Sequence, residues 1–334
     1  MFSIRSHERA TDTYAELSFR NRDSWRSFAS EGPLSDVVSM IVLLGDERSG
    51  PVLGFTALAP GVDCPLGPPH GHCSDNFRVS IRGDLTMGRE IYPPGGFRFQ
   101  DGWKTYPKNN NSCGPEGGWE MEMFADRRGM RASAVVGGPE LEVLMIEGGR
   151  MLAAMFGLED LVAEPPPDIC GPGALASTLG STDNSGKLNG SFGDSTAWRP
   201  ADQATTIAVT LLGEPTCGPV VVLAATAPNQ EAFPAARFDT EVFRLIVKGT
   251  CTVGDRTYEA GDMRIQHAGT TGEPVVARED GLQQVIVLGD RRYAKAQAAS
   301  GTWLSSLDAI VAELDGQLAA REPVAPPVRE FATI

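Results

Sequence analysis

The sequence of 334 residues is poor in histidine, in aromatic side chains and in long apolar runs. It contains four histidines and 7% aromatic residues. No stretch approaches the ~18 consecutive apolar residues that a membrane-spanning helix requires. Residues 1–20 are mixed and charged, and they lack the apolar core of a secretory signal peptide. We therefore expect no membrane span, no secretion signal and a cytoplasmic location.

Basic residues are outnumbered by acidic ones. The chain has 29 Lys and Arg against 43 Asp and Glu, which gives a formal net charge of −14 and a pI near 4.8. An acidic surface repels nucleic-acid phosphates and anionic lipid headgroups. We therefore expect neither nucleic acid nor membrane as a partner, and a small-molecule substrate instead.

Cysteine pairs and several common catalytic motifs are also missing. There is no CxxC pair, no glycine-rich loop followed by Lys-Ser/Thr, no G-x-S-x-G and no H-E-x-x-H. A chain of this length can build its core without disulfides, so we interpret the cysteines as reduced thiols. The six scattered cysteines are Cys64, Cys73, Cys113, Cys170, Cys217 and Cys251.

Glycine and proline, by contrast, are abundant. The 38 Gly and 24 Pro separate short apolar runs, a pattern typical of antiparallel strands joined by tight turns. Helical spacing is found at 8–28, 150–162 and 304–318. The predicted strands lie at 37–44, 52–58, 77–81, 121–124, 206–212, 220–225, 243–247 and 284–288.

The chain is too long for one ordinary domain. A stretch rich in Pro, Gly, Ser and Asn interrupts the strand pattern near its middle and predicts a linker. The expected segments are an N-terminal segment packing on the sheets (1–35), a first domain (36–163), the linker (164–205), a second domain (206–295) and a C-terminal helix and tail (296–334).

The two halves contain an internal repeat. Four blocks recur in the same order with nearly constant spacing, which is far longer than the period of a solenoid repeat and indicates domain duplication. The matching blocks are 43–45 with 211–213, 77–83 with 243–249, 95–100 with 261–266, and 126–128 with 290–292.

A short motif in the first copy carries a family resemblance. His70 and His72, followed by Asn76 and Gly83, resemble the first cupin motif, in which an HxH triplet precedes a glutamate and then a glycine. Asn76 stands in the place of the glutamate. Registering the second cupin motif on the following strand places Tyr106 at its histidine.

With the duplication, the sequence resembles a bicupin. The resemblance implies an all-β-dominated fold of two tandem antiparallel jelly-roll barrels, with short flanking helices at the N-terminus, after the first barrel and at the C-terminus. It also implies a divalent first-row transition metal in the barrel mouth. His70 and His72 would share one face of a strand, and two imidazoles suit Fe, Ni, Mn or Zn. Asp75 could join them if a bulge turned it inward.

The second copy lacks the ligand residues. Features found in both copies, such as Arg78 with Arg244 and the Asp-Arg-Arg triplets at 126–128 and 290–292, are therefore interpreted as architectural. Features confined to the first copy, including Tyr106 and the polar stretch 108–113, are candidates for function. The stretch is either a lid over the barrel mouth or an ordinary surface loop. The second-copy residues at the ligand positions are Ala236, Phe238, Val242 and Gly272.

The remaining candidate residues each have alternative interpretations. Asn76 is expected to hydrogen-bond substrate or metal-bound water, and Tyr106 to serve as third ligand or proton donor. Arg78 could clamp a substrate carboxylate or form a structural ion pair. Glu120 and Glu122 share one strand face, which is either a solvated outer face or an inward source of a base or ligand.

We therefore expect a metal-dependent small-molecule enzyme in the first barrel, with dioxygenase-type chemistry ranked first. The alternatives are a non-catalytic metabolite-binding bicupin and a metal-free epimerase or isomerase using acid–base chemistry. The helix at 304–318 is compatible with a homodimer.

Overall fold

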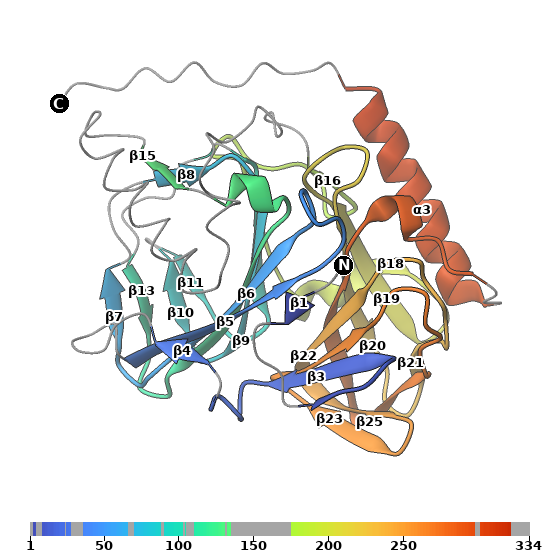
Figure 1. Cartoon of the computed structure of the whole chain (residues 1–334), viewed down its shortest axis with the longest axis horizontal. Coiled ribbons are helices and arrows are strands. Elements are labelled where there is room, and N and C mark those ends of the chain that lie inside the picture. Colours follow the sequence, from blue (N-terminus) through green and yellow to red (C-terminus); the bar gives the residue numbers. More distant parts are fainter. Residues whose placement is uncertain are drawn as a thin grey trace.

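The computed structural model describes residues 3–4, 9–23, 25–27, 36–65, 70–87, 90–102, 104, 110–130, 132–134, 175–297 and 301–321. These residues form two β-rich units, with helix α3 (Thr302–Ala319) lying along the outer side of the second unit (Figure 1). The pairs between described strands are antiparallel. The predicted β-dominated antiparallel fold and the C-terminal helix are confirmed.

The first unit contains an eight-stranded sheet and two smaller ones. In order across the large sheet, the strands are β1 (Ser3–Ile4), β5 (Val37–Leu43), β6 (Val52–Leu58), β14 (Gly118–Phe124), β9 (Asn76–Arg82), β12 (Gly96–Gln100) and β17 (Lys187–Ser191), and β4 (Arg26–Ser27) pairs with β5. The smaller sheets comprise β11 (Glu90–Tyr92), β10 (Leu85–Met87), β13 (Asn110–Cys113) and β7 (Asp63–Pro65), and β15 (Ala132–Ala134) with β8 (His70–His72).

The second unit is built on an eleven-stranded sheet. In order, its strands are β16 (Ala176–Ser177), β19 (Thr205–Leu211), β20 (Val220–Thr226), β25 (Val275–Leu288), β22 (Val242–Val253), β24 (Asp262–Gln266), β3 (Tyr14–Ser18) and β2 (Arg9–Ala10). At its sides lie β18 (Arg199–Pro200), β21 (Glu231–Phe233) and β23 (Arg256–Glu259). Short 3-10 helices are η2 (Arg127–Gly129), η3 (Phe192–Ala197) and η4 (Arg291–Tyr293).

The sequence repeat corresponds to a structural repeat. Strands β5 and β19 start 168 residues apart (37 and 205), as do β6 and β20 (52 and 220). Strands β9 and β22 start 166 apart (76 and 242), as do β12 and β24 (96 and 262). Two of the repeated blocks are therefore central strands of both sheets, and the other two lie at a strand end and at a 3-10 helix.

The repeated Asp-Arg-Arg triplets have the architectural role expected of them. Asp126 caps η2, and the guanidinium of Arg127 donates to the carbonyl oxygens of residues 44, 47 and 50 at 2.6, 3.1 and 3.0 Å. In the second unit Asp290 caps η4, and Arg291 donates to the carbonyl oxygens of residues 212, 215 and 218. Each arginine fastens the turn between the first two central strands of its unit.

The two units exchange a strand. Strand β3, which precedes the first unit in the chain, pairs with β24 of the second unit. Strand β17, which precedes the second unit, pairs with β12 of the first. Each sheet is thus completed by a strand from the other half of the chain.

Two expectations about these exchanged segments are wrong. We expected a helix within residues 8–28, but Tyr14–Ser18 is a strand whose Ala15 and Leu17 are buried on one face. Pairing with the edge of β24 overrides the helical spacing of the apolar residues. Residues 187–191 were expected in the linker, and their polar sequence gave no sign that they would bond to β12. The helix expected at 150–162 lies outside the described residues.

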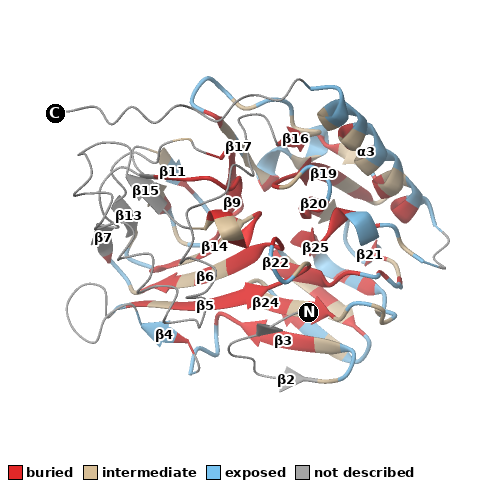
Figure 2. Ribbon diagram, turned by 45° about the horizontal axis from the view of Figure 1, so that its top comes forward, coloured by how far each residue is buried: buried red, intermediate tan, exposed pale blue. Residues whose placement is uncertain are grey.

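The main core lies where the units meet. One continuous cluster of buried residues contains Phe77, Val79 and Met121 of the first sheet together with Phe243 and Leu245 of the second. Figure 2 shows this burial concentrated in the central strands of both units. The apolar face of α3, including Leu307 and Leu314, is buried against the second unit.

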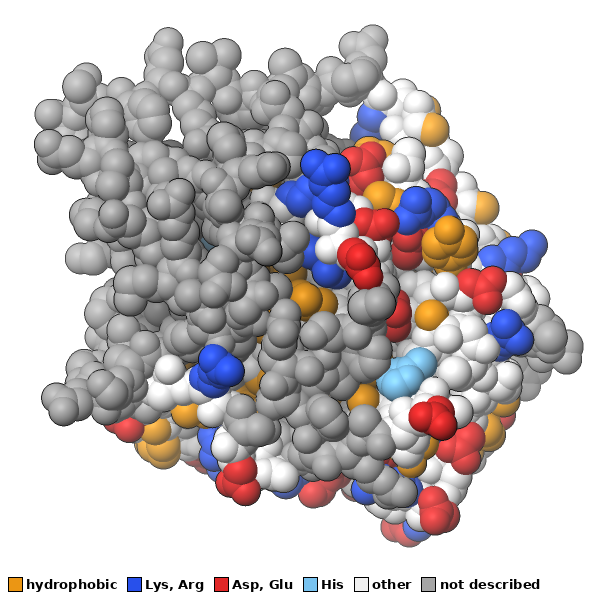
Figure 3. Space-filling model, in the orientation of Figure 1, with side chains coloured by type: hydrophobic (Ala, Val, Ile, Leu, Met, Phe, Trp, Pro, Cys, Tyr) orange, Lys and Arg blue, Asp and Glu red, His pale blue; other side chains and the backbone are white. Residues whose placement is uncertain are grey.

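The charged groups can be followed on one face of the molecule. On the face shown in Figure 3, acidic and basic side chains are interspersed over the described part of the second unit. No helix among the described residues is both long and apolar enough to cross a membrane.

Candidate functional site

The inner face of the first sheet is opposite the face that packs in the core between the units. On β9, Phe77 and Val79 belong to that core, so Asn76, Arg78 and Ser80 face the inside of the first unit, because alternate strand residues share a face. We call this surface the first inner face. Neighbouring strands contribute Ser39, Thr56, Arg98, Gln100, Glu120, Glu122 and Phe124 to it.

At five positions the first inner face is polar where its counterpart in the second unit is apolar. The strand positions correspond one to one, so the difference reflects the side chains and not the backbone. Buried polar side chains cost stability unless they are paired, so the polar residues at these positions make the first unit a candidate for holding a polar ligand. The substituted pairs are Ser39 and Ile207, Thr56 and Ala224, Asn76 and Val242, Ser80 and Ile246, and Glu122 and Ile286.

His72 lies at the edge of the first inner face. Its Nδ1 is 2.7 Å from the carbonyl oxygen of Met130, and its ring lies 4.6 Å from that of Phe124. A carbonyl accepts only from a protonated nitrogen, so the contact selects the tautomer in which Nδ1 carries the proton and Nε2 is basic. This is the arrangement usual for a metal-binding histidine.

His70 precedes it on β8, and its side chain lies outside the described part of the chain. Among the side chains that the structure does describe, no group of three or more His, Cys, Asp and Glu is arranged to hold a metal ion.

Arg78 is held between two glutamates. It forms an ion pair with Glu122, and its Nη1 lies 4.0 Å from Glu120. Glu120 is 5% exposed, so the expected default of a solvated outer face is wrong for this residue. The face of β14 that carries Met121 and Met123 packs in the core between the units, which turns Glu120 inward. Burial raises the pKa of Glu120 to about 7.

Two amide side chains on this face have unsatisfied acceptors. Asn76 and Gln100 pair directly across β9 and β12. Both are buried, and neither Asn76 Oδ1 nor Gln100 Oε1 has a hydrogen-bond partner among the described residues. Buried acceptors are normally satisfied, so this pair is suited to a ligand that donates hydrogen bonds.

Asp75 is not turned toward the histidines. Its carboxylate accepts hydrogen bonds from the backbone amides of Gly102 at 2.7 Å and Gly213 at 2.9 Å. The possibility that a bulge brings Asp75 to the metal position is therefore wrong, because one oxygen accepts within the first unit and the other joins the two units. Burial raises the pKa of Asp75 to about 7.

Other candidates lie partly or wholly outside the described residues. Tyr106 does so entirely. Within the stretch 108–113, residues Asn110–Cys113 form β13, which pairs with β10 and β7. That part of the stretch is therefore a strand of a small sheet and not an irregular loop.

Sequence reasoning missed Ser39, Thr56 and Gln100 of the first inner face. The signal that could have found Ser39 and Thr56 was in the repeat, because each interrupts an apolar strand where the second copy has Ile207 or Ala224. Gln100 has no such signal, since Gln266 matches it in the second copy.

No family model and no curated protein matches the sequence. Among solved structures, a protein of Nostoc punctiforme provisionally assigned as a dioxygenase is similar with a TM-score of 0.51 at 12% identity, covering 90% of this chain and 92% of that one. Oxalate decarboxylase of Bacillus subtilis is similar with a TM-score of 0.41 at 14% identity, covering 98% of this chain and 90% of that one. The first of these similarities shows that the chain has a cupin-type fold.

Proposed function

We propose that this protein of cupin-type fold is a metal-dependent enzyme acting on a small, carboxylate-bearing molecule inside the first unit. The observation that supports this most is the set of five positions at which the first inner face is polar and its duplicate is apolar. Dioxygenase-type oxidation is the reaction class that we rank first, as the sequence resemblance implies.

His70 and His72 would hold a divalent first-row transition metal. The residues fit such an ion, because the contact of His72 with Met130 leaves Nε2 as the basic nitrogen. A bound metal would act as a Lewis acid or activate dioxygen. Tyr106 would serve as a third ligand or as a proton donor.

The described residues supply binding and proton transfer. A substrate carboxylate would compete with Glu122 for the guanidinium of Arg78. The acceptors of Asn76 and Gln100 would orient a hydroxyl or amino group of the substrate. Glu120, with a pKa raised to about 7, would hold or release a proton near neutral pH.

A metal-free acid–base isomerase is the second candidate. Glu120 is the observation that favours it, because a buried carboxyl with a pKa of about 7 beside a guanidinium can act as general acid or base without a metal.

Elemental analysis of the purified protein separates these candidates. The wild type, grown with Fe, Mn, Ni or Zn supplements, should carry about one equivalent of metal, and the His70→Ala/His72→Ala double variant should lose it. His267→Ala is the matched control and should retain the metal, because this histidine lies in the second unit. A wild type with less than about a tenth of an equivalent under all supplements would exclude the metal enzyme.

A further inference from the structure

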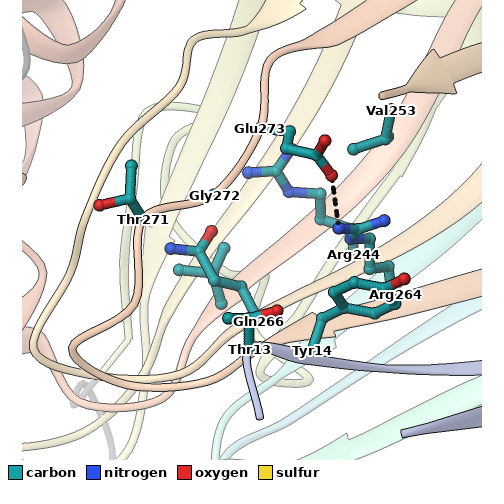
Figure 4. A pocket seen from close by; sticks show the side chains of 10 residues that line it. Thr13, Tyr14, Arg244, Val253, Arg264, Gln266, Thr271, Gly272 and Glu273 are labelled. Carbon is teal, nitrogen blue, oxygen red and sulfur yellow. Dashed lines mark hydrogen bonds and ion pairs between the residues drawn. The ribbon is translucent and has the colours of Figure 1, made fainter. Parts of the chain in front are cut away.

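The second unit contains a cavity of about 100 Å³ on its own inner side (Figure 4). It lies where the first unit has its proposed site, because Val242 and Gly272 occupy the positions of the missing ligands. Its lining is nonetheless cationic and polar. The lining residues are Thr13, Tyr14, Val242, Arg244, Val253, Arg264, Gln266, Thr271, Gly272 and Glu273.

Arg244 is the unusual member of this lining. It is 8% exposed, and its guanidinium lies 3.8 Å from the ring centroid of Phe233. Within the part of the chain that the structure describes, which includes the whole of 175–297, no hydrogen bond or ion pair reaches its guanidinium. A buried arginine without an anionic or hydrogen-bonding partner carries a large desolvation cost.

A second guanidinium adds to the positive charge beside Arg244. Arg264 pairs with Arg244 directly across β24 and β22, and like charges in this position repel each other. Arg264 is neutralised by Glu273 at 3.0 Å and lies 3.6 Å from Glu16 of the exchanged strand. Figure 4 shows Arg264 with Glu273 at the cavity beside Arg244. Glu16 also forms an ion pair with Arg256, so three guanidiniums share two carboxylates and one positive charge is left without compensation.

The equivalent arginine of the first unit is paired with a carboxylate. Its equivalent pair, Arg98 and Arg78, is also cross-strand, but Arg98 is bound by Glu90 and Arg78 by Glu122. In the second unit Ile286 takes the place of Glu122, so the carboxylate that neutralises this arginine has been lost while the arginine remains.

No other described group replaces the lost carboxylate. Gln284, at the position of Glu120, is neutral. The nearby thiol of Cys251 has its pKa raised to about 12 by burial, so it is uncharged at neutral pH. Burial together with the charge of Arg264 lowers the pKa of Arg244 to about 9, which leaves the guanidinium cationic near pH 7.

We propose that the second unit binds a small carboxylate anion, which takes the place of the lost glutamate carboxylate on Arg244. A planar carboxylate matches the fork of a guanidinium and can accept two hydrogen bonds from it. A cavity of about 100 Å³ is smaller than the ~150 Å³ that holds benzene, so the ligand has roughly six non-hydrogen atoms or fewer. Acetate, pyruvate and oxalate are of this class.

The exchanged strand β3 contributes to this cavity. Tyr14 of β3 lines the cavity, and the guanidinium of Arg264 lies 3.8 Å from the centroid of its ring. Thr13, next to it, is a neutral hydrogen-bonding group at the same wall. The second site is therefore assembled from both ends of the chain.

Calorimetric titration with acetate, pyruvate, oxalate and phosphate tests this proposal, with acetamide and chloride as matched neutral and simple-anion probes. The titrations use the His70→Ala/His72→Ala variant beside the wild type, so that binding in the first unit is recognised separately. We expect a carboxylate site that is present in both proteins, whereas a site that is lost in the double variant belongs to the first unit. No heat of binding is expected with acetamide or with chloride at the same ionic strength.

Substitutions locate the site. Arg244→Leu should weaken carboxylate binding at least about tenfold, and Arg244→Lys should weaken it less, because an ammonium keeps the charge but loses the fork. Arg278→Leu removes an exposed arginine of the same sheet and should change nothing. If Arg244→Leu fails to fold, the carboxylate affinities of Arg244→Lys and Arg278→Leu are compared instead, and only Arg244→Lys should bind more weakly than the wild type. Absence of carboxylate binding, binding of phosphate alone, or unchanged binding in the Arg244 variants would overturn the proposal.

Discussion

The carboxylate of Asp75 accepts a hydrogen bond from the backbone amide of Gly213, 138 residues further along the chain. The relation is reciprocal, because Glu241 in the second unit accepts from the amide of Gly45 at 3.0 Å. Two buried acidic side chains, at equivalent positions of the duplicated strands, therefore join the units through backbone groups.

Removal of these carboxylates is expected to destabilise the protein unequally. Asp75→Ala leaves the buried amides of Gly102 and Gly213 without an acceptor, whereas Glu241→Ala leaves that of Gly45. Each unsatisfied amide costs about 1–3 kcal/mol. We therefore expect the free energy of unfolding to fall by about 2–6 kcal/mol in Asp75→Ala and by about 1–3 kcal/mol in Glu241→Ala. Urea denaturation measures both. Equal losses would contradict the assignment of two acceptor bonds to Asp75.

Stability is expected to fall as the pH rises from about 4 to 7. Burial raises the pKa of Asp75 from 3.8 and of Glu120 from 4.5, both to about 7. Over that interval the folded protein binds more protons than the unfolded chain, so the free energy of unfolding decreases with pH. Glu120→Gln, which installs the residue found at position 284, should make the decline shallower. Glu116→Gln changes an exposed residue and serves as the control. If the free energy of unfolding declined as steeply with pH in Glu120→Gln as in the wild type and the control, the prediction would be contradicted.

Arg127 is expected to be a major contributor to stability although it is charged. Its guanidinium serves three carbonyl oxygens in different directions, and Arg127→Ala leaves them without that donor. We expect a loss of about 3 kcal/mol or more, and little rescue by Arg127→Lys because an ammonium cannot reproduce the planar fork. Thermal and urea unfolding test this. A lysine variant as stable as the wild type would show that charge alone suffices.

The two equivalent glycines at the junction of the units should differ in tolerance. Gly45 and Gly213 have φ of +65° and +68°, and an added Cβ would lie 2.3 Å from the carbonyl oxygen of Gly289 in the first case and 3.0 Å from the Cβ of Ala125 in the second. Both alanine variants incur the left-handed backbone cost of about 1–2 kcal/mol. Gly45→Ala also forces backbone atoms apart, so its midpoint of thermal unfolding should fall further. The opposite order would contradict this packing.

The sequence predicted the repeated central strands well because the blocks 77–83 and 95–100, with their copies, combine an apolar alternation with turn glycines at fixed spacing. It also located His72 on a strand of the first unit. It could not predict that Glu120 faces inward, because the alternation on β14 leaves open which face meets another sheet. Nor could it predict the partners of β3 and β17, since the free edge that a strand finds depends on the assembled neighbour and not on its own residues.

The exchange of β3 and β17 has a consequence for the origin of the chain. If either half were expressed alone, its sheet would lack an edge strand and its own leading strand would have no partner. A single ancestral unit with this connectivity would have satisfied both needs by donating its arm to a second copy and receiving one in return. Gene fusion of such a strand-swapped homodimer would yield one polypeptide whose halves can diverge in chemistry while each still completes the sheet of the other.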